Sequence, residues 1–377
     1  MTELQKILEG LRESDWWARR KAISALVACP EQEYRAFLEE GIRNHEDADI
    51  RNASIEVFRA LGARSIPALV ALSKDPDPEV RLFTANILCE IHDESALPIL
   101  SALITDHDIN VRAASAEAMG KIGDSRCLTM LEGALADETW VALAAIMAMG
   151  DIGGEYALSV LYECLENDDY REIAIAALEK AGERESIKYL TSYFDYENLS
   201  GHVLRAIVKI AEREHVRPQP EYFINLVPKL IEMIGSPDKE GRLRAFTALC
   251  WAKDISGLSY MIEALKDEEL QESAIEGLLG IGRKAVCGIV DELRGTSGSH
   301  RVILAKVLDM LGESRALLQF AEDEDPEVRA QVALSLGSVD LKRAASTLSG
   351  MLADPYEEVR LAAKQSLATL REKGLLA

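Results

Sequence analysis

The side chains that most often carry catalysis are present in this chain, but they are scattered. Its histidines are His45, His92, His107, His202, His215 and His300. None of them forms an HExxH motif, and no set of His, Cys, Asp and Glu has the spacing of metal ligands. The sequence also lacks a glycine-rich phosphate loop and a GxSxG nucleophile elbow. It therefore predicts no catalytic residue, no metal site and no cofactor.

The six cysteines show no spacing typical of a metal site or of a disulfide framework. They are Cys29, Cys89, Cys127, Cys164, Cys250 and Cys287. Because they are widely separated and form no CxxC pair, we expect reduced thiols in a cytosolic protein. The opening residues MTELQKILEG resemble neither a signal peptide nor a transit peptide, and no apolar run is long enough for a membrane span. A cytoplasmic location follows as an expectation.

The charge of the chain is strongly negative and unevenly spread. The net charge is −22 over 377 residues. Residues 1–198 hold 19 Lys and Arg against 37 Asp and Glu, whereas residues 199–377 hold 23 against 27. An acidic surface opposes binding to nucleic-acid phosphates or anionic lipid, so we expect neither partner. It favours solubility, or a protein partner with a basic segment.

Residues 75–103 show the elements that the chain repeats. Asp77 is placed to cap a helix, Pro78 fits the first helical position, and Glu79 complements the helix dipole. Apolar residues then recur at spacings of three and four, which predicts one buried helix face. A second, shorter helix is predicted from residue 97. Two such helices cannot bury both apolar faces alone, so they need neighbouring copies.

The same pattern recurs about twelve times. The residues equivalent to Val80 are Ala18, Ile50, Val111, Val141, Tyr170, Leu199, Gly241, Leu270, His300, Val328 and Val359. An arginine usually follows this position: Arg19, Arg51, Arg81, Arg112, Arg171, Arg242, Arg301, Arg329 and Arg360. An acidic residue usually precedes it by three: Asp15, Asp47, Asp77, Asp108, Glu138, Asp238, Asp267 and Asp325. This recurring pattern predicts an all-α fold, an α-α superhelix of about twelve helical hairpins.

The recurring Asp and Arg lie four residues apart on one helix face. They are therefore expected to pair within a turn, or to reach the adjacent unit and form a ladder. The arginine is missing at Ala142, Ser200 and Gln271. These gaps are either sequence drift or places where a surface is freed for a ligand.

Segments such as DINVRAASAEAMGKIGD (108–124) and DPEVRAQVALSLGSVD (325–340) resemble HEAT repeats. The short unit and the VRxxAxxALG phrase are similar to the bacterial repeats called phycobilisome-lyase-type. This resemblance implies a right-handed α-α superhelix, with second helices lining a concave face that binds partners. Deoxyhypusine hydroxylases, another HEAT-like family, hold iron with several His-Glu pairs. This chain departs from that pattern because it has one pair, His45-Glu46.

The repeat weakens between residues 185 and 235, which suggests three parts. These are an acidic N-terminal array (1–198), a degenerate repeat and linker (199–235) and a C-terminal array (236–377). The break is rich in aromatic residues and includes Tyr193, Phe194 and Tyr196. It is interpreted either as a degenerate repeat filled by large side chains, or as a hinge that carries an aromatic contact patch.

Departures from the common unit supply the candidate partner-binding residues. Apolar residues occupy slots that should face outward: Leu143, Met147, Leu243, Trp251, Val302 and Met310. Trp17 and Trp140 share the slot before the anchor, where an acidic residue is usual. Exposed apolar and aromatic residues in a row suggest a binding site, although packing inside an irregular superhelix could bury the same residues.

These observations favour a non-enzymatic HEAT-repeat scaffold or adaptor. We expect it to bind a protein partner on the concave face through the candidate residues, with no cofactor. The alternative implied by the resemblance is a phycobilin lyase-like enzyme or chaperone that acts on a protein-bound chromophore.

Overall fold

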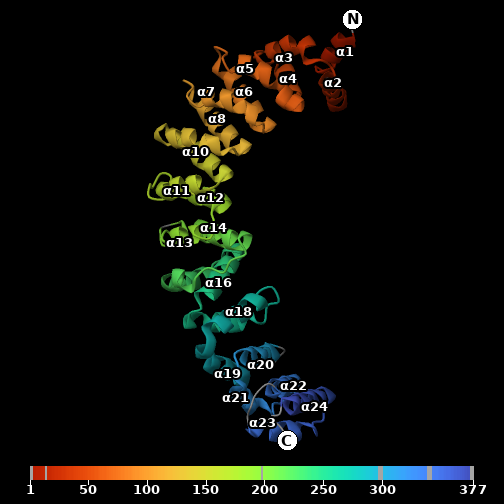
Figure 1. Ribbon diagram of the computed structural model, residues 1–377, viewed down its shortest axis with the longest axis vertical. Coiled ribbons are helices and arrows are strands. Elements are labelled where there is room, and N and C mark those ends of the chain that lie inside the picture. Colours follow the sequence, from red (N-terminus) through yellow and green to blue (C-terminus); the bar gives the residue numbers. More distant parts are fainter. Residues whose placement is uncertain (1–2, 13–14, 197, 296–299, 338–341, 374–377) are drawn as a thin grey trace. The chain divides into compact units, whose positions relative to one another are not determined.

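The computed structural model describes residues 3–12, 15–196, 198–295, 300–337 and 342–373. Every regular element in these residues is a helix, and none is a strand. The chain divides into two compact units, Met1–Glu214 and His215–Ala377, called here the N-terminal and C-terminal units. Figure 1 shows each unit as a stack of short helices, running from red to green and from green to blue. The predicted all-α solenoid of helical hairpins is confirmed.

Long and short helices alternate along the N-terminal unit. The long helices are α2 (Trp16–Ala28), α4 (Ala48–Leu61), α6 (Pro78–Ile91), α8 (Ile109–Ile122), α10 (Thr139–Ile152), α12 (Arg171–Ala181) and α14 (Ser200–Arg213). The short helices are α1 (Glu3–Gly10), α3 (Arg35–Ile42), α5 (Ile66–Leu72), α7 (Leu97–Leu103), α9 (Leu128–Gly133), α11 (Glu155–Cys164) and α13 (Ser186–Thr191). Each long helix packs against the long helices of its neighbouring repeats, so the long helices form a continuous layer.

The C-terminal unit continues the alternation. Its long helices are α16 (Lys239–Ala252), α18 (Gln271–Ile281), α20 (His300–Met310), α22 (Pro326–Leu336) and α24 (Glu357–Glu372). Its short helices are α15 (Val227–Ile234), α17 (Leu258–Ala264), α19 (Val286–Gly295), α21 (Ser314–Leu317) and α23 (Lys342–Met351). The described residues of the two units thus hold twelve long helices, in agreement with the predicted number of repeats.

Aspartates begin many of the long helices, as their spacing predicts. The Asp77 carboxylate accepts a hydrogen bond from the Glu79 N–H at 2.9 Å, which satisfies a backbone donor that has no partner inside the helix. The same side-chain cap is made by Asp15, Asp47, Asp108, Asp238 and Asp325. Glu138 stands at the cap position of α10 without capping it, and α18 begins after Leu270 rather than Asp267.

Small residues let neighbouring long helices approach closely. A Cβ atom on Gly120 of α8 would lie 2.6 Å from the Ala148 Cα of α10. Gly150 of α10 meets Ala177 of α12 in the same way, at 2.8 Å. Helices α8, α10 and α12 therefore pack almost backbone to backbone at these points, which a larger side chain would prevent.

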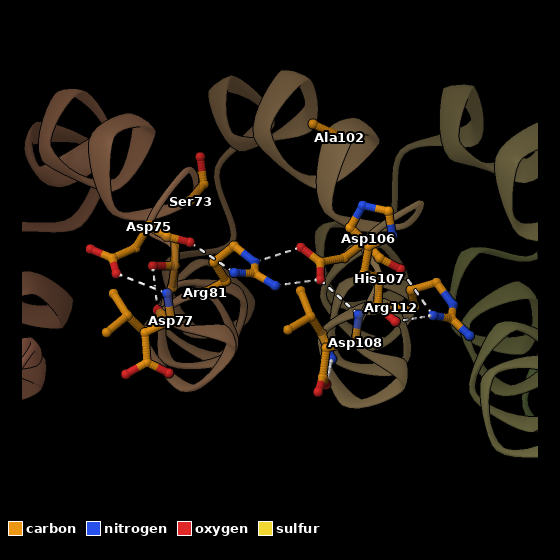
Figure 2. A network of polar contacts seen from close by, with 12 residues as sticks. Ser73, Asp75, Asp77, Arg81, Ala102, Asp106, His107, Asp108 and Arg112 are labelled. Carbon is orange, nitrogen blue, oxygen red and sulfur yellow. Dashed lines mark hydrogen bonds and ion pairs between the residues drawn. The ribbon is translucent and has the colours of Figure 1, made fainter. Parts of the chain in front are cut away.

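The recurring arginine joins one repeat to the next. The Arg81 Nε and Nη2 atoms donate to the two oxygens of Asp106 at 2.7 and 2.8 Å, and Nη1 donates to the Asp75 carbonyl at 2.8 Å. Figure 2 shows this pair and the equivalent Arg112 in the following repeat. We call such a link a rung. The closed rungs are Arg81–Asp106, Arg112–Asp137, Arg301–Asp323 and Arg329–Asp354.

The expected ladder of ion pairs from one repeat to the next is therefore confirmed, whereas the expected pairing within a turn is wrong. The Asp77 side chain caps its helix and contacts His45, with 2.6 Å between Oδ2 and Nε2. The acceptor of each rung is instead an aspartate in the loop before the next long helix. The Asp77 carboxylate is already engaged by the start of its own helix and by His45, and the Arg81 guanidinium reaches the loop of the next repeat instead.

The series of rungs changes after α10, where Ala142 replaces the arginine. In the following repeat, Arg171 donates to the Leu165 carbonyl at 2.7 Å. Its guanidinium lies 4.4 Å from the centre of the Tyr196 ring, a cation–π contact. Tyr196 thus stands where the closed rungs have the aspartate of the next repeat, while Nη1 of Arg171 pairs with Asp168 in its own loop.

Three of the six aromatic residues between positions 185 and 235 are buried, namely Tyr193, Phe194 and Phe223. Phe194 is fully buried, and Tyr193 is 8% exposed and donates to a Glu166 carboxylate oxygen at 2.6 Å. Their predicted place in a contact patch is wrong, because large side chains fill the interior where the repeat is irregular. Tyr196 is 47% exposed. The boundary between the two units lies inside the 199–235 segment, and its role as a hinge stays a prediction.

Candidate partner-binding groove

The layer of long helices in the N-terminal unit contains a groove with a volume of about 580 Å³. We call it the Trp140 groove. Four consecutive long helices, α6, α8, α10 and α12, contribute to its lining. The lining residues are Leu82, Asn110, Ala113, Ala114, Glu117, Lys121, Trp140, Leu143, Ala144, Met147, Ala148, Asp151, Ile173 and Lys180. A surface feature that crosses four repeats suits an elongated ligand better than a compact one.

Helix α10 supplies the apolar anchors of the groove. Its sequence, TWVALAAIMAMGDI, contains a single charged residue, Asp151. Trp140 lies in its first turn and is 63% exposed, while Leu143 and Met147 follow on the same face and are half-buried. A water-exposed indole beside two partly exposed apolar side chains is a typical anchor site for a protein partner.

The floor of the groove is made from alanines of α8 and α10. Ala113 and Ala114 are buried on α8, and Ala148 is buried on α10. Ala148 is also the residue that Gly120 of α8 approaches closely, so small side chains on both helices permit this packing. Small floor residues between larger flanking side chains create the depression, so the same packing that holds the repeats together also shapes the site.

One end of the groove is bordered by a row of three charges from successive repeats. Asp151 on α10 lies between Lys121 on α8 and Lys180 on α12, with carboxylate-to-ammonium distances of 3.1 and 2.6 Å. Burial alone would raise the pKa of Asp151, but the hydrogen bonds from Lys180 and Lys121 outweigh it and hold the pKa below its ordinary value. The Asp151 carboxylate therefore stays ionised near neutral pH, and its two ion pairs connect three successive repeats.

Glu117 is the exposed acid of the groove. It lies on α8, and no ion pair to it occurs among the described residues. A carboxylate beside an apolar groove suits a basic side chain of a partner. The surrounding acidic array, with 37 Asp and Glu against 19 Lys and Arg in residues 1–198, also attracts a positively charged partner.

The structure brings three of the predicted site residues together, Trp140, Leu143 and Met147. Trp17 shares the slot of Trp140 and is 72% exposed on α2, where its ring meets that of Trp16 edge to face at a centroid distance of 4.8 Å. It is not part of the Trp140 groove. Two aromatic positions predicted by one rule thus belong to different surfaces.

The predicted residues of the C-terminal unit do not form one site. Leu243 lines a separate cleft, and Met310 is 62% exposed on α20. The outward orientation predicted for Trp251 is wrong, since this residue is 7% exposed and its ring lies 5.8 Å from the Phe223 ring. The segment before α15 covers Trp251, and helix periodicity alone carries no information about such a cover.

Sequence reasoning missed the other half of the Trp140 groove. Leu82 occupies the same slot on α6 as Leu143 does on α10, and Glu117 occupies the slot of Met147. The three charges of the row share a further slot. All of them could have been found by extending the outward-slot rule to polar residues and to neighbouring repeats.

The described residues contain no group of three or more His, Cys, Asp or Glu side chains that could hold a metal ion. All six cysteines are unpaired. Burial raises the pKa of Cys89, Cys127 and Cys164 to about 11 and that of Cys250 to about 12, so these thiols stay protonated near neutral pH. His45, of the only His-Glu pair in the sequence, contacts Asp77 and Glu79 in the loop and helix start of the next repeat.

None of the helices described here is long and apolar enough to cross a membrane.

Comparison with protein families identifies the repeats. A family model of HEAT repeats matches residues 66–142 and 286–368, one stretch in each unit. The chain therefore contains HEAT repeats in both units. The first matched stretch runs from α5 into α10 and therefore includes the repeats that build much of the Trp140 groove.

Several solved structures are similar to the chain at low sequence identity, and the first of them shows the same helical-solenoid fold. This chain is 12% identical to yeast importin-β, Kap95p, in a complex with RanGDP, with a TM-score of 0.55; the match covers 99% of this chain and 62% of Kap95p. A second importin-β structure is 16% identical, with a TM-score of 0.49 and coverage of 99% and 56%. The CpcE–CpcF phycocyanin lyase complex of Nostoc is 18% identical, with a TM-score of 0.34 and coverage of 66% and 94%. No curated protein matches the chain.

Proposed function

We propose that this protein is a non-enzymatic scaffold that binds a segment of a partner protein in the Trp140 groove. The observation that carries the proposal is the exposed Trp140 indole beside Leu143 and Met147 in a groove that crosses four repeats. An indole exposed to water gains free energy when a partner covers it, and aromatic anchors are enriched among residues that dominate binding.

The partner segment is proposed to be amphipathic and basic. Its apolar side chains would cover Trp140 and Met147, and a Lys or Arg would pair with Glu117. The rest of the acidic array would raise the association rate through long-range attraction, so binding should weaken as salt is added. A reducing, cytoplasmic setting is part of the proposal, because all six cysteines are unpaired.

The test is affinity purification from an extract of the source cells, followed by binding measurements with the recovered partner. The variant Met147→Glu places a charge in the groove, and Met310→Glu is its matched control on an exposed methionine of the other unit. We expect Met147→Glu to lose the partner while Met310→Glu retains it. Equal recovery with both variants would remove the groove from the proposal.

The lyase alternative stays an untested prediction. Absorbance of the purified chain in the visible range, or transfer of added bilin to an acceptor protein, would support it. Neither result is expected for a plain scaffold.

A further inference from the structure

In the C-terminal unit, one rung of the arginine ladder is open. Arg242 Nη1 donates to the carbonyls of Ser236 and Pro237 at 2.8 and 2.9 Å, as Arg81 does to the carbonyls of its own loop. Among the described residues, however, no carboxylate forms an ion pair with Arg242. In the four closed rungs, by contrast, other nitrogens of the guanidinium bind a carboxylate of the next repeat.

The expected acceptor of this rung is present. Asp267 follows Arg242 by the same 25 residues that separate Arg81 from Asp106. Its Oδ1 atom accepts from the Glu269 N–H at 2.9 Å, just as Asp106 accepts from the Asp108 N–H at 2.9 Å. Both halves of the rung are therefore held by their own loops in the usual way, and only the link between them is missing.

A cleft of about 700 Å³ is lined by both of these residues. The other charges in its lining are compensated, because Lys266 pairs with Glu263 and Lys239 lies 3.8 Å from Glu269. Its apolar wall consists of Ile234, Leu243, Phe246, Tyr260 and Leu270. The cleft thus offers one donor group and one acceptor group that lack an ion-pair partner, Arg242 and Asp267, beside an apolar surface.

We propose that an extended peptide segment of a partner protein binds in this cleft, with an amide group bridging Arg242 and Asp267. The amide oxygen accepts from the guanidinium, and the amide N–H donates to the carboxylate. An adjacent apolar side chain of the segment contacts Leu243 and Tyr260. A carboxylate ligand would satisfy Arg242 but be repelled by Asp267, and an ammonium would have the opposite difficulty. Only a group that both accepts and donates complements the open rung.

This cleft is a second site, in a different unit from the Trp140 groove, and it does not depend on the function proposed above. The C-terminal unit provides an internal comparison. Beside the closed Arg329–Asp354 rung lies a cavity of about 760 Å³ lined mostly by polar residues, among them Gln319, Glu322, Ser346 and Thr347. A cavity at this position therefore does not by itself open the rung.

The experiment uses the full chain and two small probes, N-acetyl-leucine N-methylamide and N-acetyl-leucine. The methyl resonances of Leu243 are followed by NMR as each probe is added. Arg242→Ala and Asp267→Ala test the two bridging residues, and Asp106→Ala, in a closed rung of the other unit, is the control. We expect the methylamide to shift Leu243, with a dissociation constant raised about tenfold in either variant and unchanged in the control.

Two results would overturn the proposal. One is tighter binding of the carboxylate probe than of the methylamide, with Asp267→Ala strengthening it, which would identify an anion site instead. The other is an unchanged Leu243 resonance with both probes, or binding that neither substitution weakens. Circular dichroism of each variant confirms that the helices are intact. A negative result here leaves the Trp140 groove untouched, because its test uses other residues and another unit.

Discussion

Arg112 of one repeat and Asp137 of the next are joined by two nearly parallel hydrogen bonds, with 2.7 Å between Nε and Oδ2 and 2.8 Å between Nη2 and Oδ1. The third nitrogen of the same guanidinium binds the carbonyls of Asp106 and His107 in the loop before its own helix. One side chain therefore closes a loop and connects two repeats. This double duty gives a structural reason for the recurrence of an arginine at this position.

Removing that arginine should destabilise the N-terminal unit. In Arg112→Ala, Asp137 loses its partner and two loop carbonyls lose a donor. We expect the free energy of unfolding to fall by about 2 kcal/mol, since the guanidinium is mostly shielded from water. Urea unfolding followed by circular dichroism measures the loss. Arg126→Ala is the control: its side chain is 64% exposed and pairs with acids on the surface, so the loss should stay below about 1 kcal/mol.

The rungs should also make the protein sensitive to acid. The hydrogen bonds from Arg112 and Arg329 hold the pKa of Asp137 and Asp354 below the ordinary value of 3.8. A carboxyl group whose folded-state pKa is lowered stabilises the fold above its unfolded pKa, and this stability is lost as pH falls through the folded pKa. We expect stability to drop below about pH 4, with a shallower drop in Arg112→Ala. An equal drop in both proteins would show that other carboxylates dominate.

Close packing at the floor of the Trp140 groove gives a test with opposite signs at two glycines. In Gly120→Ala the new methyl group would lie 2.6 Å from the Ala148 Cα atom, so α8 and α10 must separate. We expect a loss of about 1–3 kcal/mol in unfolding free energy. Gly133 lies in α9 with no atom within 4 Å of an added Cβ, so Gly133→Ala should stabilise the protein by about 0.5–1 kcal/mol. Thermal unfolding of the two variants checks both signs, and stabilisation by Gly120→Ala would contradict the packing.

Much of the architecture could be predicted because it depends on local rules. Asp77, Pro78 and the apolar spacing after them define a helix start within a few residues, and the structure places α6 there. The rung acceptor could not be predicted in the same way. Asp77 is the acid nearest to Arg81 along the sequence, but it caps its own helix and contacts His45, and the partner of Arg81 is Asp106 in the next repeat.

The residues of the candidate site show the same contrast between features that local sequence determines and features that depend on distant parts of the chain. Leu143 and Met147 occupy outward slots of a regular helix, and the structure places both, half-buried, in the lining of the Trp140 groove. Trp251 occupies a slot of the same kind and is buried, because Phe223 from a non-repeating segment covers it. Helix periodicity describes how a residue faces its own layer, and it cannot describe a cover that comes from an irregular part of the chain.

The open rung makes a prediction about energetic coupling that does not require any ligand. In a double-mutant cycle, the coupling energy between Arg329 and Asp354 should be about 1–2 kcal/mol, because two hydrogen bonds of 2.8 and 3.0 Å join them. The coupling between Arg242 and Asp267 should be close to zero, because each is held by its own loop and they do not form an ion pair. Alanine substitutions and urea unfolding provide both cycles within the same unit. Equal coupling in the two cycles would mean that the Arg242–Asp267 rung closes in solution, and the cleft would then have no unpaired groups to offer a peptide.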